Sequence, residues 1–253
     1  MKNGGSAAAG RVLILGPDQP GWQRTDLAVI GYRAVASMDG ITASAPRPRL
    51  RGRLHQIAFF VSIPMGSVVV LAAETAVARA ASAIYALAVT GMYAASAAFH
   101  RIEWSARAWA WMRRIDHSMI FVLIAGTYTP FSLLVLEPPW STVMLAAVWG
   151  GAATGVALRL VTHRLDAVRQ ALYLTLGWLA VLTLPFTIGR LGVVAVLLLI
   201  GGGLFYTIGA VLFLRRVPRL RPEIFGYHEV WHAMVIGGTL CHYALVLILV
   251  VRR

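Results

Sequence analysis

Three polar residues near the C-terminus have the types and spacing of a metal site. The sequence there reads FGYHEVWHAMVIGGTLCHY, in which His228, Glu229 and His232 interrupt an apolar run. In the H-E-x-x-H motif of zinc metalloproteases, both histidines bind the metal and the glutamate is the general base. Residues four apart on an α-helix project from one face, so His228 and His232 can bind the same ion.

Another histidine is the predicted third ligand. Zinc in a catalytic site typically takes three protein ligands and leaves its fourth position to water. His100 ends an earlier apolar run and Asp116 begins the next one, with Ser96 one helical turn before His100. We predict that His100 joins His228 and His232 around the metal, and that Asp116 holds the bound water or orients a ligand.

The composition places these residues in a membrane protein. Of the 253 residues, 58% are hydrophobic and only 13% are charged, and the mean hydropathy is +0.72. These values lie far outside the range of soluble domains. The net charge of +13 does not indicate nucleic-acid binding, because the arginines form short clusters between apolar runs and not one basic face. The single cysteine, Cys241, excludes an intramolecular disulfide.

Seven apolar runs are long enough to cross a bilayer, which takes roughly 18 residues or more of α-helix. They cover residues 55–73, 80–100, 115–136, 141–161, 171–188, 191–214 and 227–251. The sequence therefore predicts an all-α, multi-pass protein of the plasma (inner) membrane. Pro64, Pro130 and Pro185 fall inside these runs, where we expect kinks and not breaks.

The arginines of alternate connections predict the orientation of the spans. Fifteen lie on one side: Arg47, Arg49, Arg51, Arg53, Arg101, Arg107, Arg113, Arg114, Arg159, Arg164, Arg169, Arg215, Arg216, Arg219 and Arg221. Four lie on the other: Arg79, Arg190, Arg252 and Arg253. The N-terminus is therefore expected in the cytoplasm and the C-terminus outside. In this orientation His100, Asp116, His228 and His232 share one depth, in the cytoplasmic leaflet, although they come from three different spans.

The first fifty residues do not fit the pattern of spans. Residues 1–50 are rich in Gly, Pro and Ser and hold no apolar run long enough for a signal peptide. We expect a disordered cytoplasmic tail there and a seven-helix transmembrane domain over 51–253. A translation start at Met38 is an alternative, because the first span needs nothing before about residue 46.

Three motifs in these spans resemble those of the hemolysin III family, part of the progestin and adipoQ receptor superfamily. The motifs are Ser96-x-x-x-His100, Arg114-x-Asp116-His117-Ser118 and Phe225-Gly226-Tyr227-His228-Glu229-x-x-His232. The resemblance, which extends to the alkaline ceramidases, implies that His100, His228 and His232 bind Zn²⁺, with Ser96 and Asp116 close to the metal and its water. Many members carry Glu-x-x-Asn near the first span, whereas this chain has Leu50-Arg51-Gly52-Arg53-Leu54-His55.

Several functions fit such a site. The favoured one is a zinc-dependent hydrolase that acts on a lipid amide or ester in the bilayer. A receptor or sensor with structural zinc is an alternative, and a pore-forming cytolysin is another that the family name suggests. An intramembrane metalloprotease is disfavoured, because such enzymes also use an aspartate in an Asn-Pro-Asp-Gly type segment, which this sequence lacks.

Other polar residues of the spans have simpler interpretations. His242 lies about 15 Å along the helix from His232, too far to join the site, and we expect it to serve helix packing with Cys241. His55 lies at the cytoplasmic end of the first span and is expected to be solvated. Glu229 is expected at the start of its helix, near the positive end of the dipole, where it meets Arg219 or Arg221. The glycines at 201–203 predict a close-packing helix face.

Overall fold

The computed structural model describes residues 48–161, 165–218, 220–221 and 223–252. These residues form α-helices and no β-strand. The helices are α2 (Arg53–Leu71), α3 (Ala76–Arg101), α4 (Ala106–Val135), α5 (Trp140–Val161), α6 (Asp166–Trp178), α7 (Leu184–Arg215) and α8 (Tyr227–Val251), with a 3₁₀ segment, η1 (Leu179–Thr183), between α6 and α7. Most of the predicted N-terminal tail, with its alternative start at Met38, lies outside the described residues.

Within the described residues, six segments are long and apolar enough to cross a membrane, one fewer than the sequence predicts. Five of them are the single helices α2, α3, α4, α5 and α8. The sixth is the 48-residue stretch Val168–Arg215, which joins most of α6 to η1 and α7. It covers both predicted spans 171–188 and 191–214, so the difference in number lies entirely in this stretch.

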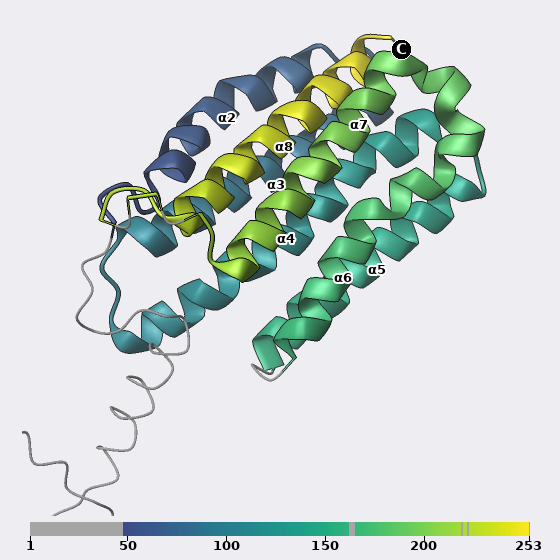
Figure 1. Ribbon diagram of the computed structural model, residues 1–253. Coiled ribbons are helices and arrows are strands. Elements are labelled where there is room, and N and C mark those ends of the chain that lie inside the picture. Colours follow the sequence, from purple (N-terminus) through teal and green to yellow (C-terminus); the bar gives the residue numbers. More distant parts are fainter. Residues whose placement is uncertain (1–47, 162–164, 219, 222, 253) are drawn as a thin grey trace, which may run out of the picture. The chain divides into compact units, whose positions relative to one another are not determined.

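The long stretch is not one straight helix. Trp178 donates from Nε1 to Thr207 Oγ1 at 3.0 Å. The two residues would lie about 40 Å apart on a continuous helix, so the chain reverses between them. Gly192 lies in this interval with φ 74° and ψ 161°, a backbone conformation that glycine reaches without steric cost. Figure 1 shows the result, with α6 beside α5 and α7 beside α8.

The prolines affect their helices differently. Pro64 and Pro130 lie inside α2 and α4, which continue past them, as predicted. Pro185 lies in the first turn of α7, directly after the 3₁₀ segment. Its missing N–H cannot extend the α-helical hydrogen-bond pattern from α6, and the 3₁₀ segment distorts the helix there. The helical stretch Val168–Arg215 nevertheless continues past Pro185, as expected for a distortion and not a break.

Small residues allow the helices that carry the candidate site to approach closely. A Cβ placed on Gly126 of α4 would lie 2.3 Å from the Ala88 Cβ of α3, and one on Gly66 of α2 would lie 2.9 Å from the Ala86 Cβ. Such contacts are typical of helix packing in membranes. In the most apolar 18-residue segment of α4, 67% of the residues are buried, whereas in that of α2 only 22% are buried. Helix α4 is therefore central, and α2 presents much of its surface to the surrounding bilayer.

The start of α2 is fixed to the segment that leads into α8. The backbone N–H groups of Arg49 and Leu50 donate to the carbonyls of Glu223 and Ile224 at 3.0 and 3.2 Å. Gly52, with φ 75°, then turns the chain into α2, and a Cβ there would lie 2.5 Å from the His100 Cβ. Helix α2 therefore begins directly beside one of the predicted metal ligands.

Candidate metal centre

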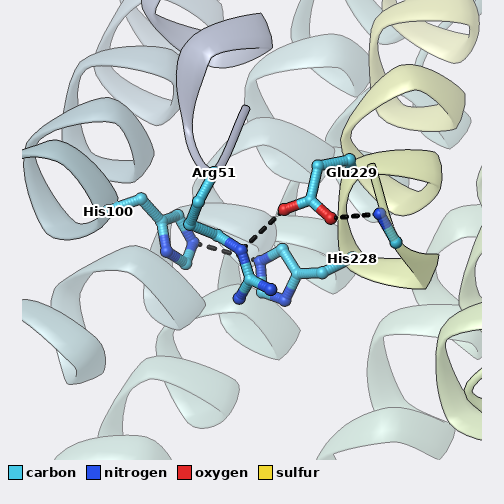
Figure 2. A network of polar contacts seen from close by, with 5 residues as sticks. Arg51, His100, His228 and Glu229 are labelled. Carbon is cyan, nitrogen blue, oxygen red and sulfur yellow. Dashed lines mark hydrogen bonds and ion pairs between the residues drawn. The ribbon is translucent and has the colours of Figure 1, made fainter. Parts of the chain in front are cut away.

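The three predicted ligand histidines come together at one end of α3 and α8. One ring nitrogen from each of His100, His228 and His232 lies within 4.8 Å of the other two. The Nε2 atoms of His100 and His228 are 3.2 Å apart, and Figure 2 shows this contact between two rings whose planes are nearly perpendicular. Two nitrogens bound tetrahedrally to one zinc ion at 2.0–2.1 Å would be about 3.3 Å apart. The cluster therefore fits a divalent metal ion.

One nitrogen of the third ring, that of His232, has no partner among the described residues. His232 is buried, and its Nδ1 has no hydrogen-bond partner among the described residues. A buried polar atom without a partner is unfavourable. Imidazole nitrogens are common ligands of zinc, which agrees with a metal bound at this cluster.

His55 of α2 belongs to the same cluster, which the sequence analysis did not anticipate. Only 2% of its surface is exposed, so the expectation of a solvated side chain was wrong. Its ring stacks on that of His232, with centroids 3.8 Å apart and planes 12° apart, and its Nδ1 lies 2.8 Å from Ser96 Oγ. The rotation of α2 about its axis turns this face inward. His55 lies outside the group of three converging nitrogens, and it orients His232 by contact.

Ser96 links the histidines to the predicted carboxylate. It is 3% exposed on α3, and its hydroxyl contacts both His55 and the carboxyl of Asp116 on α4. Arg159 of α5, also buried, acts electrostatically on Asp116. In the sequence, Arg159 indicates only the orientation of the spans. Side chains from five helices, α2, α3, α4, α5 and α8, thus meet around the histidine cluster.

Glu229 has both carboxylate oxygens engaged. It is fully buried in the first turn of α8, as predicted, and its Oε2 accepts from the Gly226 N–H at 2.8 Å. Its Oε1 accepts from Arg51 Nε at 2.6 Å (Figure 2). The expected partners were Arg219, which lies outside the described residues, or Arg221; the structure has Arg51 instead. A carboxylate held in this way is poorly placed to act as the general base of an H-E-x-x-H protease.

His242 lies apart from the cluster, as predicted. Its Nε2 lies 3.3 Å from the carbonyl oxygen of Leu199, and its ring packs where a Cβ on Gly202 would be, 2.3 Å from Nε2. A Cβ on Gly203 would meet the Trp178 ring at 3.4 Å. The close-packing role predicted for the glycines at 201–203 is confirmed at these two positions.

Fold and site together define a multi-pass helical membrane protein with a cluster of histidines between its helices. A family model described as haemolysin-III related matches residues 43–243, and the chain belongs to this family. It is 31% identical to Hemolysin-3 of Bacillus cereus over 190 residues, which cover 73% of this chain and 83% of that protein.

Two further relatives extend the comparison. The chain is 32% identical to a Hemolysin-3 homolog of Bacillus subtilis over 140 residues, 54% of this chain and 62% of that protein. It is 31% identical to the heptahelical transmembrane protein ADIPOR1 of Oryza sativa over 159 residues, 55% of this chain and 42% of that protein. The likeness to ADIPOR1 supports the relation to the progestin and adipoQ receptor superfamily. The bacterial relatives are consistent with a location in the plasma membrane.

Proposed function

We propose that the protein is a zinc-dependent hydrolase of a lipid amide or ester bond. His100, His228 and His232 bind the metal, Asp116 is the general base, and Ser96 positions Asp116. The observation that carries the proposal is the chain of contacts that joins the three converging imidazoles to the carboxyl of Asp116 through His55 and Ser96. Three protein ligands and an adjacent base are the parts that hydrolytic zinc sites use.

The chemistry divides between the metal and the chain. Zinc, when bound, acts as a Lewis acid that lowers the pKa of its water towards about 7. Asp116 accepts a proton as the water oxygen forms a bond to the carbonyl carbon of the lipid. The carbon–nitrogen or carbon–oxygen bond to the leaving group then breaks, and Asp116 gives the proton to the departing atom.

The substitution Asp116→Asn tests the proposal. The amide keeps the shape of the side chain but cannot accept the proton, and general bases typically contribute about 10²–10⁴-fold to rate. We expect hydrolysis of a ceramide and phospholipid panel to fall in that range while zinc remains bound. The control is Glu137→Gln, whose carboxylate is 70% exposed and paired with Arg190. Equal rates for Asp116→Asn and the parent, or no cleavage by either, would contradict the proposal.

We also propose seven membrane crossings, with the N-terminus in the cytoplasm and the C-terminus outside. The stretch Val168–Arg215 would be about 72 Å long as one helix, more than twice a hydrocarbon core of about 30 Å. The reversal near Gly192 supports two crossings there, and one relative is named heptahelical. A reporter fused after Arg253 should lie outside the cell, and one inserted between Arg215 and Arg221 should lie inside.

A receptor or sensor with structural zinc is the second candidate. The observation in its favour is the contact network itself, because His55, Ser96 and the three ligands join α2, α3 and α8. In that case Asp116→Asn would change stability and there would be no hydrolysis to lose. Pore formation, which the names of the Bacillus relatives suggest, is less well supported, because the site's polar residues gather at one end of their helices.

A further inference from the structure

A cavity of about 230 Å³ lies between α2, α3 and α8, beside the histidine cluster. Ile57 of α2 and Leu240 of α8 line it and are 61% and 50% exposed. Side chains so exposed on membrane helices face lipid, so the cavity is open sideways to the bilayer. The molecules that can enter by this route are those of the hydrocarbon layer.

Three polar groups in the wall of the cavity already have partners. The Ser62 hydroxyl donates to the Phe59 carbonyl at 2.8 Å, the Thr239 hydroxyl to the Val235 carbonyl at 2.9 Å, and the Tyr243 hydroxyl to Met65 at 3.2 Å. A buried water molecule needs about two to four polar partners of its own. The wall therefore favours an apolar occupant over water or a polar ligand.

The cavity is elongated and points at the candidate metal centre. It follows α2 from Leu54 to Met65, about 16 Å at the rise of an α-helix. At the Leu54 end, the lining residue Tyr93 places its ring edge on His55, with centroids 5.1 Å apart. His55 in turn stacks on His232. At the other end, the bond from Tyr243 to Met65 ties α8 to α2.

We propose that this cavity binds one acyl chain of the lipid whose polar end lies at the histidine cluster. An apolar channel that opens to the bilayer and ends one ring from a metal ligand suits a chain with a polar group at one end. The inference rests on the proposed function for the identity of the lipid. The Met65 end of the cavity would limit the length of the chain.

A photoreactive fatty acid tests this binding directly. Palmitic acid with a mid-chain diazirine is irradiated with purified protein in detergent, and the labelled peptides are mapped. Labels are expected on residues 57–65 of α2 and 236–243 of α8. Val61 lines the cavity, so Val61→Trp should lower labelling about tenfold, as expected when roughly two methylene groups lose their burial. Val68→Trp, on the same helix but outside the cavity, is the matched control.

The outcomes separate binding from catalysis. Leu240→Trp fills the cavity from α8 and should reproduce the loss, with zinc content showing that both variants fold. The inference would be overturned if labelling were unchanged in Val61→Trp and Leu240→Trp. It would also be overturned if Val68 were labelled as strongly as the residues that line the cavity. Labelling is repeated on Asp116→Asn, because photolabelling measures binding and does not require hydrolysis. If the cavity is labelled but no lipid is hydrolysed, the proposed function fails and the acyl site stands. If lipid is hydrolysed but the cavity is not labelled, the acyl site fails and the proposed function stands.

Discussion

Helix α8 carries histidines in two regions with different surroundings. His232 and His242 are both buried, 2% and 9% exposed, so burial does not distinguish them. At the start of α8, the rings of His228 and His232 meet the ring of His100 from α3. Further along, His242 meets a backbone carbonyl and a glycine of α7. The neighbouring helix thus decides whether a buried histidine is a candidate ligand or a packing residue.

The difference also lies in the network around each region. Around His232, His55 stacks on the ring and is itself held by Ser96, which contacts Asp116. Metal-binding histidines commonly have such supporting contacts. The Nε2 atom of His242 contacts the carbonyl oxygen of Leu199, and its Nδ1 atom has no partner among the described residues. No second imidazole or carboxylate converges on it there, so α8 has a single candidate metal region in the described chain.

The largest effect is expected from the ion pair beside the histidine cluster. Arg51→Ala would leave the fully buried Glu229 carboxylate without its cation, and breaking a buried pair costs about 3–5 kcal/mol. The exposed pair of Arg190 and Glu137 is the matched control, and Arg190→Ala should cost about 0–1 kcal/mol. Thermal unfolding in detergent measures both. Equal losses of stability would contradict the structural role of Arg51.

An intermediate effect is expected in the packing region. In Gly202→Ala the new methyl group would meet the His242 ring at 2.3 Å, and overpacking typically costs about 1–3 kcal/mol. Zinc content should stay at the parent level, because this region holds no ligand. Gly189→Ala, with no neighbouring atom within 4 Å, is the control on the same helix. Loss of zinc from Gly202→Ala with retained stability would break the distinction between the two regions.

A smaller effect is expected from the residue that stacks on His232. In His55→Ala the three ligands remain but His232 loses its ring contact, and loss of such supporting groups typically weakens metal affinity about 10–100-fold. Competition with a chromophoric chelator measures the affinity, and His55→Phe should restore part of it through stacking alone. An unchanged zinc affinity in His55→Ala would show that the stacking does not support the site.

Much of the fold follows from the length and position of the apolar runs. The last run, 227–251, coincides with α8 (Tyr227–Val251), because an apolar segment in a bilayer must satisfy its backbone hydrogen bonds as a helix. The histidines of α8 could be grouped because helical periodicity puts them on one face. The boundary predicted between residues 188 and 191 lies close to Gly192, but the apolar pattern does not encode the single backbone conformation on which the reversal depends.

The parts of the site that sequence reasoning missed depend on contacts between helices. Arg51 and Arg159 look like ordinary arginines at span ends, and only the packing of α2 and α5 brings them to Glu229 and Asp116. His55 did give a signal, since an ionisable residue in an apolar run is a functional candidate. Its position at the end of the run favoured a solvated side chain, and the rotation of α2 was not readable from the sequence.

Metal analysis of four alanine variants tests whether His100, His228 and His232 bind the metal. We expect one zinc ion per chain in the parent protein, loss of zinc in His100→Ala, His228→Ala and His232→Ala, and full retention in His242→Ala. Elemental analysis of monodisperse protein, purified without added chelator, gives the stoichiometry. Retention of zinc in all three cluster variants, or its loss in His242→Ala but not in His100→Ala, would contradict the assignment of the metal centre.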